Sequence, residues 1–188
     1  NYRSLSQEQA SRGTVGIPRV LNMYENYPFW HTFFTKLGFR VVLSPRSSKS
    51  IYEKGIESIP SESVCYPAKL SHGHIEALIE KGVKYIFYPS LAYERKEFDN
   101  ANNHYNCPVV TSYPEVIRNN VDNLNDNSII YRNPFMDLSN PKTLFSNLKD
   151  ELKAFNISDS DLKQAIDAGY DELSKCRKDI QEQGELVL

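Results

Sequence analysis

The sequence predicts a doubly wound α/β domain, with a mainly parallel sheet flanked by helices and a C-terminal helical pair. Up to about residue 140, short apolar segments of strand length alternate with longer segments whose apolar residues recur at helical spacing. Connections of this kind are right-handed crossovers, which make neighbouring strands parallel. From Pro141 onwards the strand-like segments stop, and two amphipathic helical segments follow.

Composition narrows the class of protein. The 188 residues include 22 basic and 24 acidic side chains, so the net charge of −2 gives no electrostatic footprint for nucleic acid or an anionic membrane. No apolar run approaches the ~20 residues that span a bilayer, and the start at Asn1 lacks a signal-peptide core. We therefore expect a cytoplasmic protein whose partners include neither nucleic acid nor membrane. Three cysteines, an odd number, favour reduced thiols or metal ligands over a disulfide framework.

Apolar patterning places the elements in order. Five short strands are expected, at residues 15–21, 39–43, 83–88, 109–111 and 128–131. Aromatic residues repeat at i, i+4 from Phe29 to Leu37 and predict a first helix that Gly38 ends. A short helix is expected from Ser50 to Ile59, and a longer one begins at Cys65 and ends at Gly82.

The two ends of the sequence suggest a piece of a longer protein. We expect residues 1–14 to be a linker or part of an upstream segment, 15–140 the α/β domain, and 141–184 a helical extension. Residues 185–188 continue an apolar run that resembles the start of a strand in a further domain. In the last helix, Cys176 falls on the apolar stripe with Leu173 and is expected to be a core residue.

The stretch around Cys65 concentrates residues that can carry chemistry. Ten residues hold five candidates for a functional site: Cys65, Tyr66, Lys69, His72 and His74. Cys65 precedes the helix and Pro67 lies in its first turn, where the positive end of a helix dipole favours a thiolate, the form that binds metals. The alternative is that Cys65 is a small buried apolar residue.

Standard metal and nucleotide motifs are absent. His72 and His74 are two residues apart on a helix, which turns the rings about 200° from each other, so they cannot share one ion and only one is expected to face the core. Without a CxxC pair or HExxH, a self-contained zinc site is disfavoured. No glycine-rich loop follows the first strand, which excludes Rossmann and P-loop sites. Cys65 and Cys107 thus offer two soft ligands, and a cluster needs more from elsewhere.

Further candidates follow the carboxyl ends of the expected strands, where open parallel sheets bind ligands. They are Arg19, Tyr24, Glu25, Arg46 and Glu94. Arg19 and Arg46 can hold a phosphate or carboxylate bidentately, or they are solvated surface arginines. The loop from Ser90 to Asn106 is long for a compact domain, which favours a functional role or a helical turn of its own.

Several longer motifs resemble one family. They are Gly16-Ile-Pro-Arg-Val-Leu-Asn-Met-Tyr-Glu25, Pro28-Phe-Trp30, Leu37-Gly-Phe39, Cys65-Tyr-Pro-Ala-Lys-Leu70 with His72-Gly-His74, Asn106-Cys-Pro-Val-Val110 and Tyr113-Pro114. Over residues 12–188 the chain is similar to the dehydratase-like region of 2-hydroxyacyl-CoA dehydratase activase-related proteins, found mainly in anaerobic bacteria. These are related to the 2-hydroxyglutaryl-CoA dehydratase-like iron–sulfur family.

The resemblance implies a redox role. Related dehydratase subunits hold an iron–sulfur cluster, such as a 4Fe–4S cluster, through cysteines from more than one domain, and an actin-like ATPase activase delivers an electron to it. Cys65 matches the first cluster cysteine. Cys107 comes later than the second one does in that family, because Ser90 to Ala92 stand directly after the third strand. The resemblance further implies an activase domain fused in the same polypeptide and an acyl-CoA or other small-molecule substrate.

Two hypotheses therefore stay open. In the first, the chain contributes part of a cluster and substrate cleft, with Cys65 and Cys107 as partial ligands tuned by Lys69, His72 and His74. The isolated chain would then bind no cluster and be inactive. In the second, the chain is a non-catalytic α/β module that docks onto the activase or binds a ligand. The catalytic residues and the substrate are not identified by the sequence.

Overall fold

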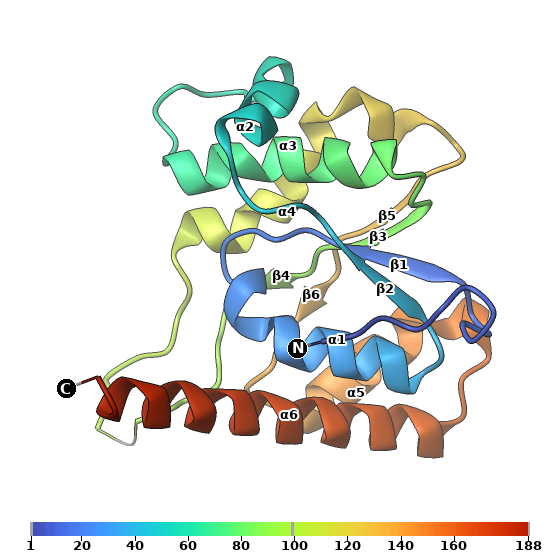
Figure 1. The fold of residues 1–188 in the computed structure, drawn as a ribbon, viewed down its shortest axis with the longest axis vertical. Helices are drawn as coiled ribbons and strands as arrows, with labels where there is room; N and C mark the ends of the chain where they lie inside the picture. Colours follow the sequence, from blue (N-terminus) through green and yellow to red (C-terminus); the bar gives the residue numbers. More distant parts are fainter. Residues whose placement is uncertain (1, 99, 188) are drawn as a thin grey trace.

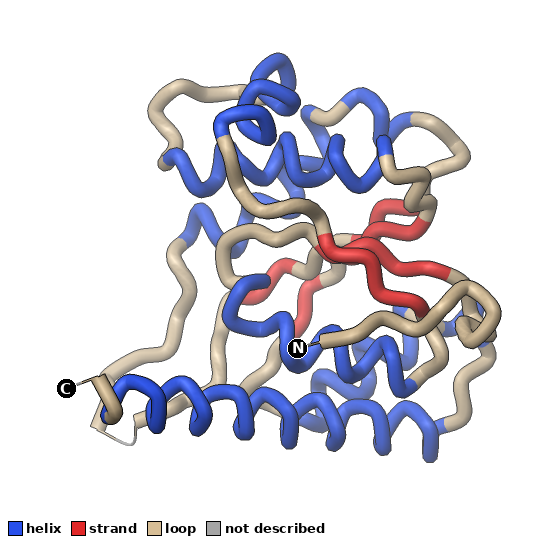
Figure 2. The backbone as a smooth tube through the Cα atoms, viewed as in Figure 1, coloured by secondary structure: helices blue, strands red, loops and turns tan. Residues whose placement is uncertain are grey.

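The computed structural model describes residues 2–98 and 100–187; Asn1, Asp99 and Leu188, which fall in the two expected terminal segments and the long loop, lie outside the described residues. A four-stranded parallel sheet lies between two helical layers, as the sequence predicts (Figures 1 and 2). Its strands, in the spatial order β2-β1-β3-β5, are β2 (Arg40–Leu43), β1 (Thr14–Ile17), β3 (Tyr85–Phe87) and β5 (Ile130–Arg132). A second parallel pair continues from β3 and β5 and consists of β4 (Ser90–Leu91) and β6 (Phe135–Met136).

The helices divide between the two faces of the sheet. On one face lie α3 (Tyr66–Glu80) and α4 (Pro108–Asn120), with α2 (Lys49–Gly55) packed outside α3 (Figure 1). On the other face lie α1 (Met23–Lys36), α5 (Pro141–Glu151) and α6 (Asp159–Glu185). Short 3-10 turns occupy Ile56–Ser58, Asp122–Asn125 and Lys153–Phe155. The helix after β1 lies on one face of the sheet, and the helix before β3 lies on the other. The order in which strands are added therefore reverses between β1 and β3, which are neighbours in the sheet.

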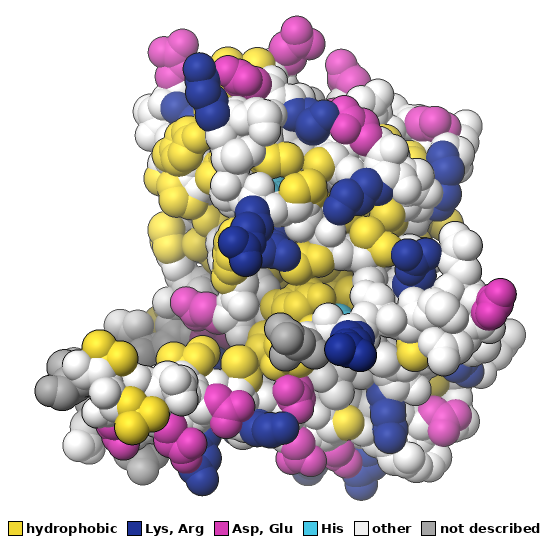
Figure 3. Space-filling view, in the orientation of Figure 1, with side chains coloured by type: hydrophobic (Ala, Val, Ile, Leu, Met, Phe, Trp, Pro, Cys, Tyr) yellow, Lys and Arg dark blue, Asp and Glu magenta, His cyan; other side chains and the backbone are white. Residues whose placement is uncertain are grey.

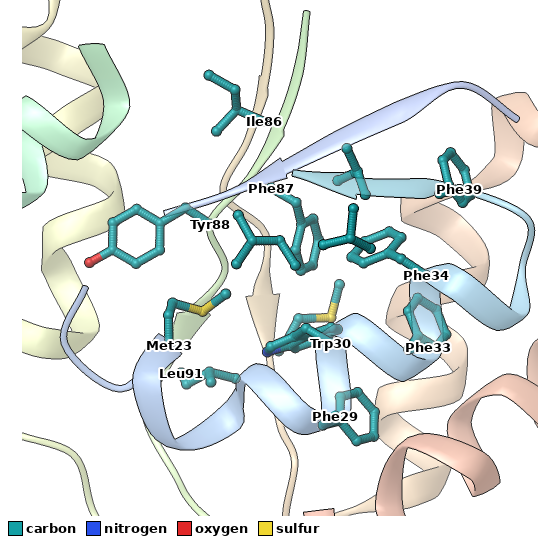
Figure 4. Packing of buried hydrophobic residues seen from close by; sticks show 14 of the residues in the cluster. Met23, Phe29, Trp30, Phe33, Phe34, Phe39, Ile86, Phe87, Tyr88 and Leu91 are labelled. Atoms are coloured by element: carbon teal, nitrogen blue, oxygen red, sulfur yellow. The ribbon is translucent and has the colours of Figure 1, made fainter. Parts of the chain in front are cut away.

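Aromatic residues of α1 form the centre of the core. Trp30, Phe33 and Phe34 are fully buried, and the helical period turns Trp30 and Phe34 towards Phe87 of the sheet. The Phe87 ring meets Trp30 at a centroid distance of 4.9 Å and Phe34 at 5.1 Å, both edge to face (Figure 4). Such pairs stabilise a core by about 0.5–1.5 kcal/mol beyond the area they bury.

The long helix α6 packs against α1 at Gly169. A Cβ at this position would lie 2.8 Å from the Phe29 ring, so only glycine permits the close approach. The apolar stripe of α6 is buried as far as Leu173. The expectation that Cys176 is a core residue is wrong: its thiol is only half-buried, and Ile180, one turn further, is 67% exposed. Past the first turn of α1, this part of α6 lies beside residues 95–98: Phe98 and Ile180 line one hollow, and Arg95 donates to Ser174 Oγ at 3.3 Å.

Two expected strands are not formed. Residues 109–111 belong to α4, since Pro108 suits the first turn of a helix and Val109, Tyr113 and Ile117 recur at i, i+4, i+8. The prediction that residues 185–188 begin a strand is wrong as well, because α6 continues through Gly184 to Glu185. Among the described residues of the long loop, Tyr93 and Tyr105 form an antiparallel bridge. The proposed domain boundaries stay predictions.

The distribution of charged side chains on the surface is consistent with the net charge of −2. On the face shown in Figure 3, basic and acidic side chains are interspersed without an extended field of one sign. Among the described helices, none combines the length and apolar character needed to cross a bilayer.

Candidate functional site

Three helices begin at the carboxyl edge of the sheet. The N-termini of α1, α3 and α4 all point to this edge, on the left of Figure 1, where β1 and β3 also end. In open α/β sheets this edge, at the point where the chain changes direction, is the usual ligand site. Both non-core cysteines lie at it.

Cys65 is the residue that precedes α3, as the sequence predicts. Its backbone is extended (φ −61°, ψ 148°), and its carbonyl oxygen accepts hydrogen bonds from the N–H groups of Ala68 and Lys69, 3.1 and 3.2 Å away. Pro67 occupies the first turn. The thiol is exposed and caps no backbone N–H, so it is free to face a ligand.

Cys107 holds the same position on α4. Its carbonyl accepts the first helical hydrogen bond, from Thr111, and Pro108 follows it directly. The thiol is exposed and makes no cap. The sequence placed Cys107 at the threshold of a strand; the structure places it at a helix entrance, which repeats the arrangement of Cys65.

The two cysteine-bearing helices are joined by a buried hydrogen bond. Tyr113 O–H of α4 lies 3.1 Å from Nε2 of His72 on α3. Burial, and then the charge of Cys65, raise the pKa of Tyr113 to about 12. Within residues 2–98 and 100–187, no three His, Cys, Asp or Glu side chains gather with a geometry that could hold a metal. The described residues therefore offer two exposed thiols at one edge.

Both histidines are fully buried, which corrects the expectation that one of them faces away from the core. The rings do point in different directions, but α3 is covered on both sides. His72 lies between Tyr113 and Ser58, whose Oγ is 2.8 Å from Nδ1. Because Ser58 O–H donates to the Gly55 carbonyl, Nδ1–H of His72 donates to Ser58 and Nε2 accepts from Tyr113.

His74 is tied to the loop after β2. Its Nδ1 lies 2.8 Å from Ser44 Oγ and its Nε2 lies 3.0 Å from Ser47 Oγ. Burial lowers the pKa of both His72 and His74 to about 4, and the charge of Arg19 lowers that of His74 further. All four ring nitrogens of the pair are thus engaged, and both rings are neutral at pH 7.

Glu94 anchors the segment that leads to Cys107. Its carboxylate accepts hydrogen bonds from three asparagine amides: Asn106 at 2.8 Å, Asn26 at 3.0 and 3.1 Å, and Asn22 at 3.3 Å. Asn22 and Asn26 belong to the start of α1, whereas Asn106 directly precedes Cys107. The carboxylate therefore joins the residue before Cys107 to the opposite helical layer.

Replacing Glu94 by alanine is expected to lower the free energy of unfolding by about 2–3 kcal/mol, because the Asn26 amide is fully buried and loses its acceptor. Glu94→Gln keeps the shape and one acceptor oxygen and should cost less than half as much. Urea unfolding of both variants measures the difference. Equal, small losses for the two variants would show that the carboxylate does not anchor this loop.

The remaining predicted residues are divided between the surface and a hollow. Lys69 Nζ donates to the Glu62 carbonyl at 2.6 Å. Glu25 and Arg46 are exposed, and Tyr66 is 53% exposed, with its ring 5.3 Å from that of Tyr52. Arg19 and Tyr24 line a hollow after β1, at the same edge of the sheet.

The site residues predicted from the sequence do not include the residues that connect these groups. The connecting residues are Tyr113, Ser58, Ser44, Ser47, Asn22, Asn26 and Asn106. The serines and asparagines resemble ordinary loop residues in the sequence, and only their partners in space distinguish them. Tyr113 could have been found from its helical spacing with Ile117, which indicates a buried face.

Comparison with known proteins gives one match. A family model described as a CoA enzyme activase uncharacterised domain matches residues 14–188. No curated protein and no solved structure matches the chain. The match confirms the activase-related family predicted from the sequence, and the finer assignment to dehydratase-like iron–sulfur proteins stays a prediction.

Proposed function

The chain belongs to the family of the CoA enzyme activase uncharacterised domain, and from that premise we propose that Cys65 and Cys107 supply two thiolate ligands of an iron–sulfur cluster. The remaining ligands come from residues outside the described part of the chain. This domain would then form one wall of a cluster and substrate cleft in a redox protein related to the 2-hydroxyacyl-CoA dehydratases.

The observation that carries the proposal is the equivalence of the two cysteines. Each precedes a helix with proline in its first turn, each thiol is exposed, and the two helices start at the same edge and are joined through His72 and Tyr113. Thiolates are the usual ligands of iron–sulfur clusters, and the positive ends of two helix dipoles favour them here. Two thiols can supply only part of the ligands that an iron–sulfur cluster needs.

The surrounding residues suit a redox centre held at a domain edge. When bound, a cluster supplies one-electron transfer, at a potential that hydrogen bonds and exposure adjust. Where α3 meets α4, His72 is neutral and Tyr113 keeps its proton at pH 7, so the link between the two cysteine-bearing helices adds no charge. Glu94 holds the Cys107 segment in place through Asn106.

The partners proposed with this role follow from the family. They are an actin-like ATPase activase domain, fused in the same polypeptide, and an acyl-CoA or other small-molecule substrate. The protein would act in the cytoplasm, where iron–sulfur centres and free thiols are kept reduced.

The test is anaerobic reconstitution of a longer polypeptide that includes this domain, with iron and sulfide, followed by iron analysis and electron paramagnetic resonance. Cys65→Ser and Cys107→Ser should each lower the iron bound and change the spectrum, whereas Cys176→Ser is the matched control and should not. The 188-residue chain alone is expected to bind no stoichiometric iron. Full iron content in the Cys65→Ser, Cys107→Ser double variant would rule out the cluster here and leave the docking module as the function.

A further inference from the structure

Arg19, directly after β1, carries a charge that the described residues leave unpaired. Its backbone N–H donates to Ser44 Oγ at 2.7 Å, which fixes the loop. The side chain is half-buried, and its Nε is buried without any hydrogen-bond partner. None of the ion pairs within residues 2–98 and 100–187 includes it. A guanidinium stays charged, and the buried Nε–H of Arg19 lacks an acceptor that a bound anion would supply.

A hollow of about 230 Å³ lies beside this guanidinium. Its lining residues are Arg19, Met23, Tyr24, Tyr27 and Leu43. Arg19 lies in the loop after β1, Met23, Tyr24 and Tyr27 lie in the first turns of α1, and Leu43 is the last residue of β2. All three segments lie at the carboxyl edge of the sheet (Figure 1). The hollow is smaller than the roughly 300–1,000 Å³ that holds a drug-sized ligand, so it suits a small molecule.

The neighbours of Arg19 do not neutralise it. His74 is neutral, with both ring nitrogens bonded to serines, and the Tyr24 hydroxyl lies 3.3 Å from Ser47 Oγ. Burial raises the pKa of Tyr27, so its hydroxyl keeps its proton. The lining therefore combines one cation with aromatic and aliphatic walls.

That combination distinguishes between anions. An arginine fork matches a carboxylate with two parallel hydrogen bonds. A phosphate usually gathers several N–H donors or cations, and the lining offers a single guanidinium. The apolar walls in addition favour a ligand that has a hydrocarbon part.

We propose that the hollow after β1 binds a small organic carboxylate, with the carboxylate on the Arg19 guanidinium and the hydrocarbon part against Met23 and Leu43. Tyr24 and Tyr27 close its sides. The site uses neither cysteine, so it does not depend on the proposed cluster.

The test titrates the 188-residue chain with acetate, butyrate, butyramide and inorganic phosphate, followed by calorimetry or nuclear magnetic resonance. Butyrate should bind more tightly than acetate, and butyramide, its neutral analogue, should not bind. Arg19→Gln should weaken butyrate binding by about tenfold or more, because a charge-assisted pair is lost. Arg40→Gln is the matched control, since Arg40 is half-buried at the opposite end of β2, and it should leave binding unchanged.

A second variant keeps the result informative if Arg19→Gln alters the fold. Tyr24 is 52% exposed, so Tyr24→Ala should fold normally, and it should weaken butyrate binding more than acetate binding. Equal binding of butyrate and butyramide, or of butyrate by the wild type and Arg19→Gln, would overturn the proposal. Tighter binding of phosphate than of butyrate would overturn the carboxylate assignment.

Discussion

Replacing Gly73 by alanine is expected to destabilise the domain by about 3 kcal/mol or more. A Cβ at Gly73 would overlap the backbone carbonyl oxygen of Ile51 on α2, where the two helices touch backbone to backbone. Gly55, at the end of α2, makes the reciprocal approach to Gly73. No side-chain rotation relieves a clash with backbone, so α2 has to move away from α3. Overpacking a well-packed site usually costs 1–3 kcal/mol even when side chains can give way.

Gly184→Ala is the matched control for this substitution. Gly184 also lies within a helix, and nothing lies within 4 Å of a Cβ built there. Alanine should therefore stabilise α6 by up to about 1 kcal/mol, the difference between the two residues in a helix interior. Urea or thermal unfolding followed by circular dichroism measures both variants. A loss below 1 kcal/mol for Gly73→Ala would contradict the close packing of α2 on α3.

Acid is expected to weaken the fold through His72 and His74. Burial lowers the pKa of each ring to about 4, against an ordinary value of 6.5 in the unfolded chain. Between these values the unfolded state binds more protons than the native state, so stability falls as the pH falls. The stability that the two neutral rings contribute is fully present above pH 6.5 and is lost progressively towards pH 4. From pH 7 to 4.5 we expect a loss of about 2 kcal/mol for each ring.

The source of this pH dependence is tested with histidine variants. His72→Gln should be less stable than the wild type at pH 7, because the links to Tyr113 and Ser58 are weakened, but its stability should fall less steeply on acidification. His104→Gln, in the loop near Tyr93, is the control and should follow the wild-type profile. The measurement is urea unfolding at several pH values between 4.5 and 7. Parallel profiles for the wild type and His72→Gln would assign the acid loss to other groups.

The sheet and most helices could be predicted because their patterns are local. In the segment Phe29 to Leu37, the spacing of aromatic residues alone determines which face is buried, and Gly38 ends the helix with a positive φ of 83°. The prediction failed where local propensity and helical period disagree. Val109 to Thr111 is a β-branched run, but Tyr113 and Ile117 extend a buried helical face beyond it, and the burial of a whole face outweighs the preference of three residues.

Parts of the candidate site could be predicted in the same way. The position of Cys65 before a helix follows from Pro67 and from the apolar spacing of Ile75 and Leu78, all close in sequence. The equivalent position of Cys107 was not predicted, because the β-branched run Val109 to Thr111 was interpreted as a strand instead of the first turn of α4. The pairing of Cys65 with Cys107 as cluster ligands stays a prediction that reconstitution will test.

The sequence by itself determined the alternation of elements, the α/β class and the position of Cys65 directly before a helix, since each depends on residues within a few turns of one another. Only the tertiary structure decided that both histidines are buried, because α2 covers the side of α3 that its own period leaves polar. It also decided that Glu94 meets Asn22 and Asn26 across some 70 residues of sequence, and that the Arg19 side chain has a buried Nε without a hydrogen-bond partner among the described residues. Hydrogen bonds between distant segments leave no periodic signal in a sequence, because each partner is an ordinary polar residue until the packing of helices on the sheet brings the two together.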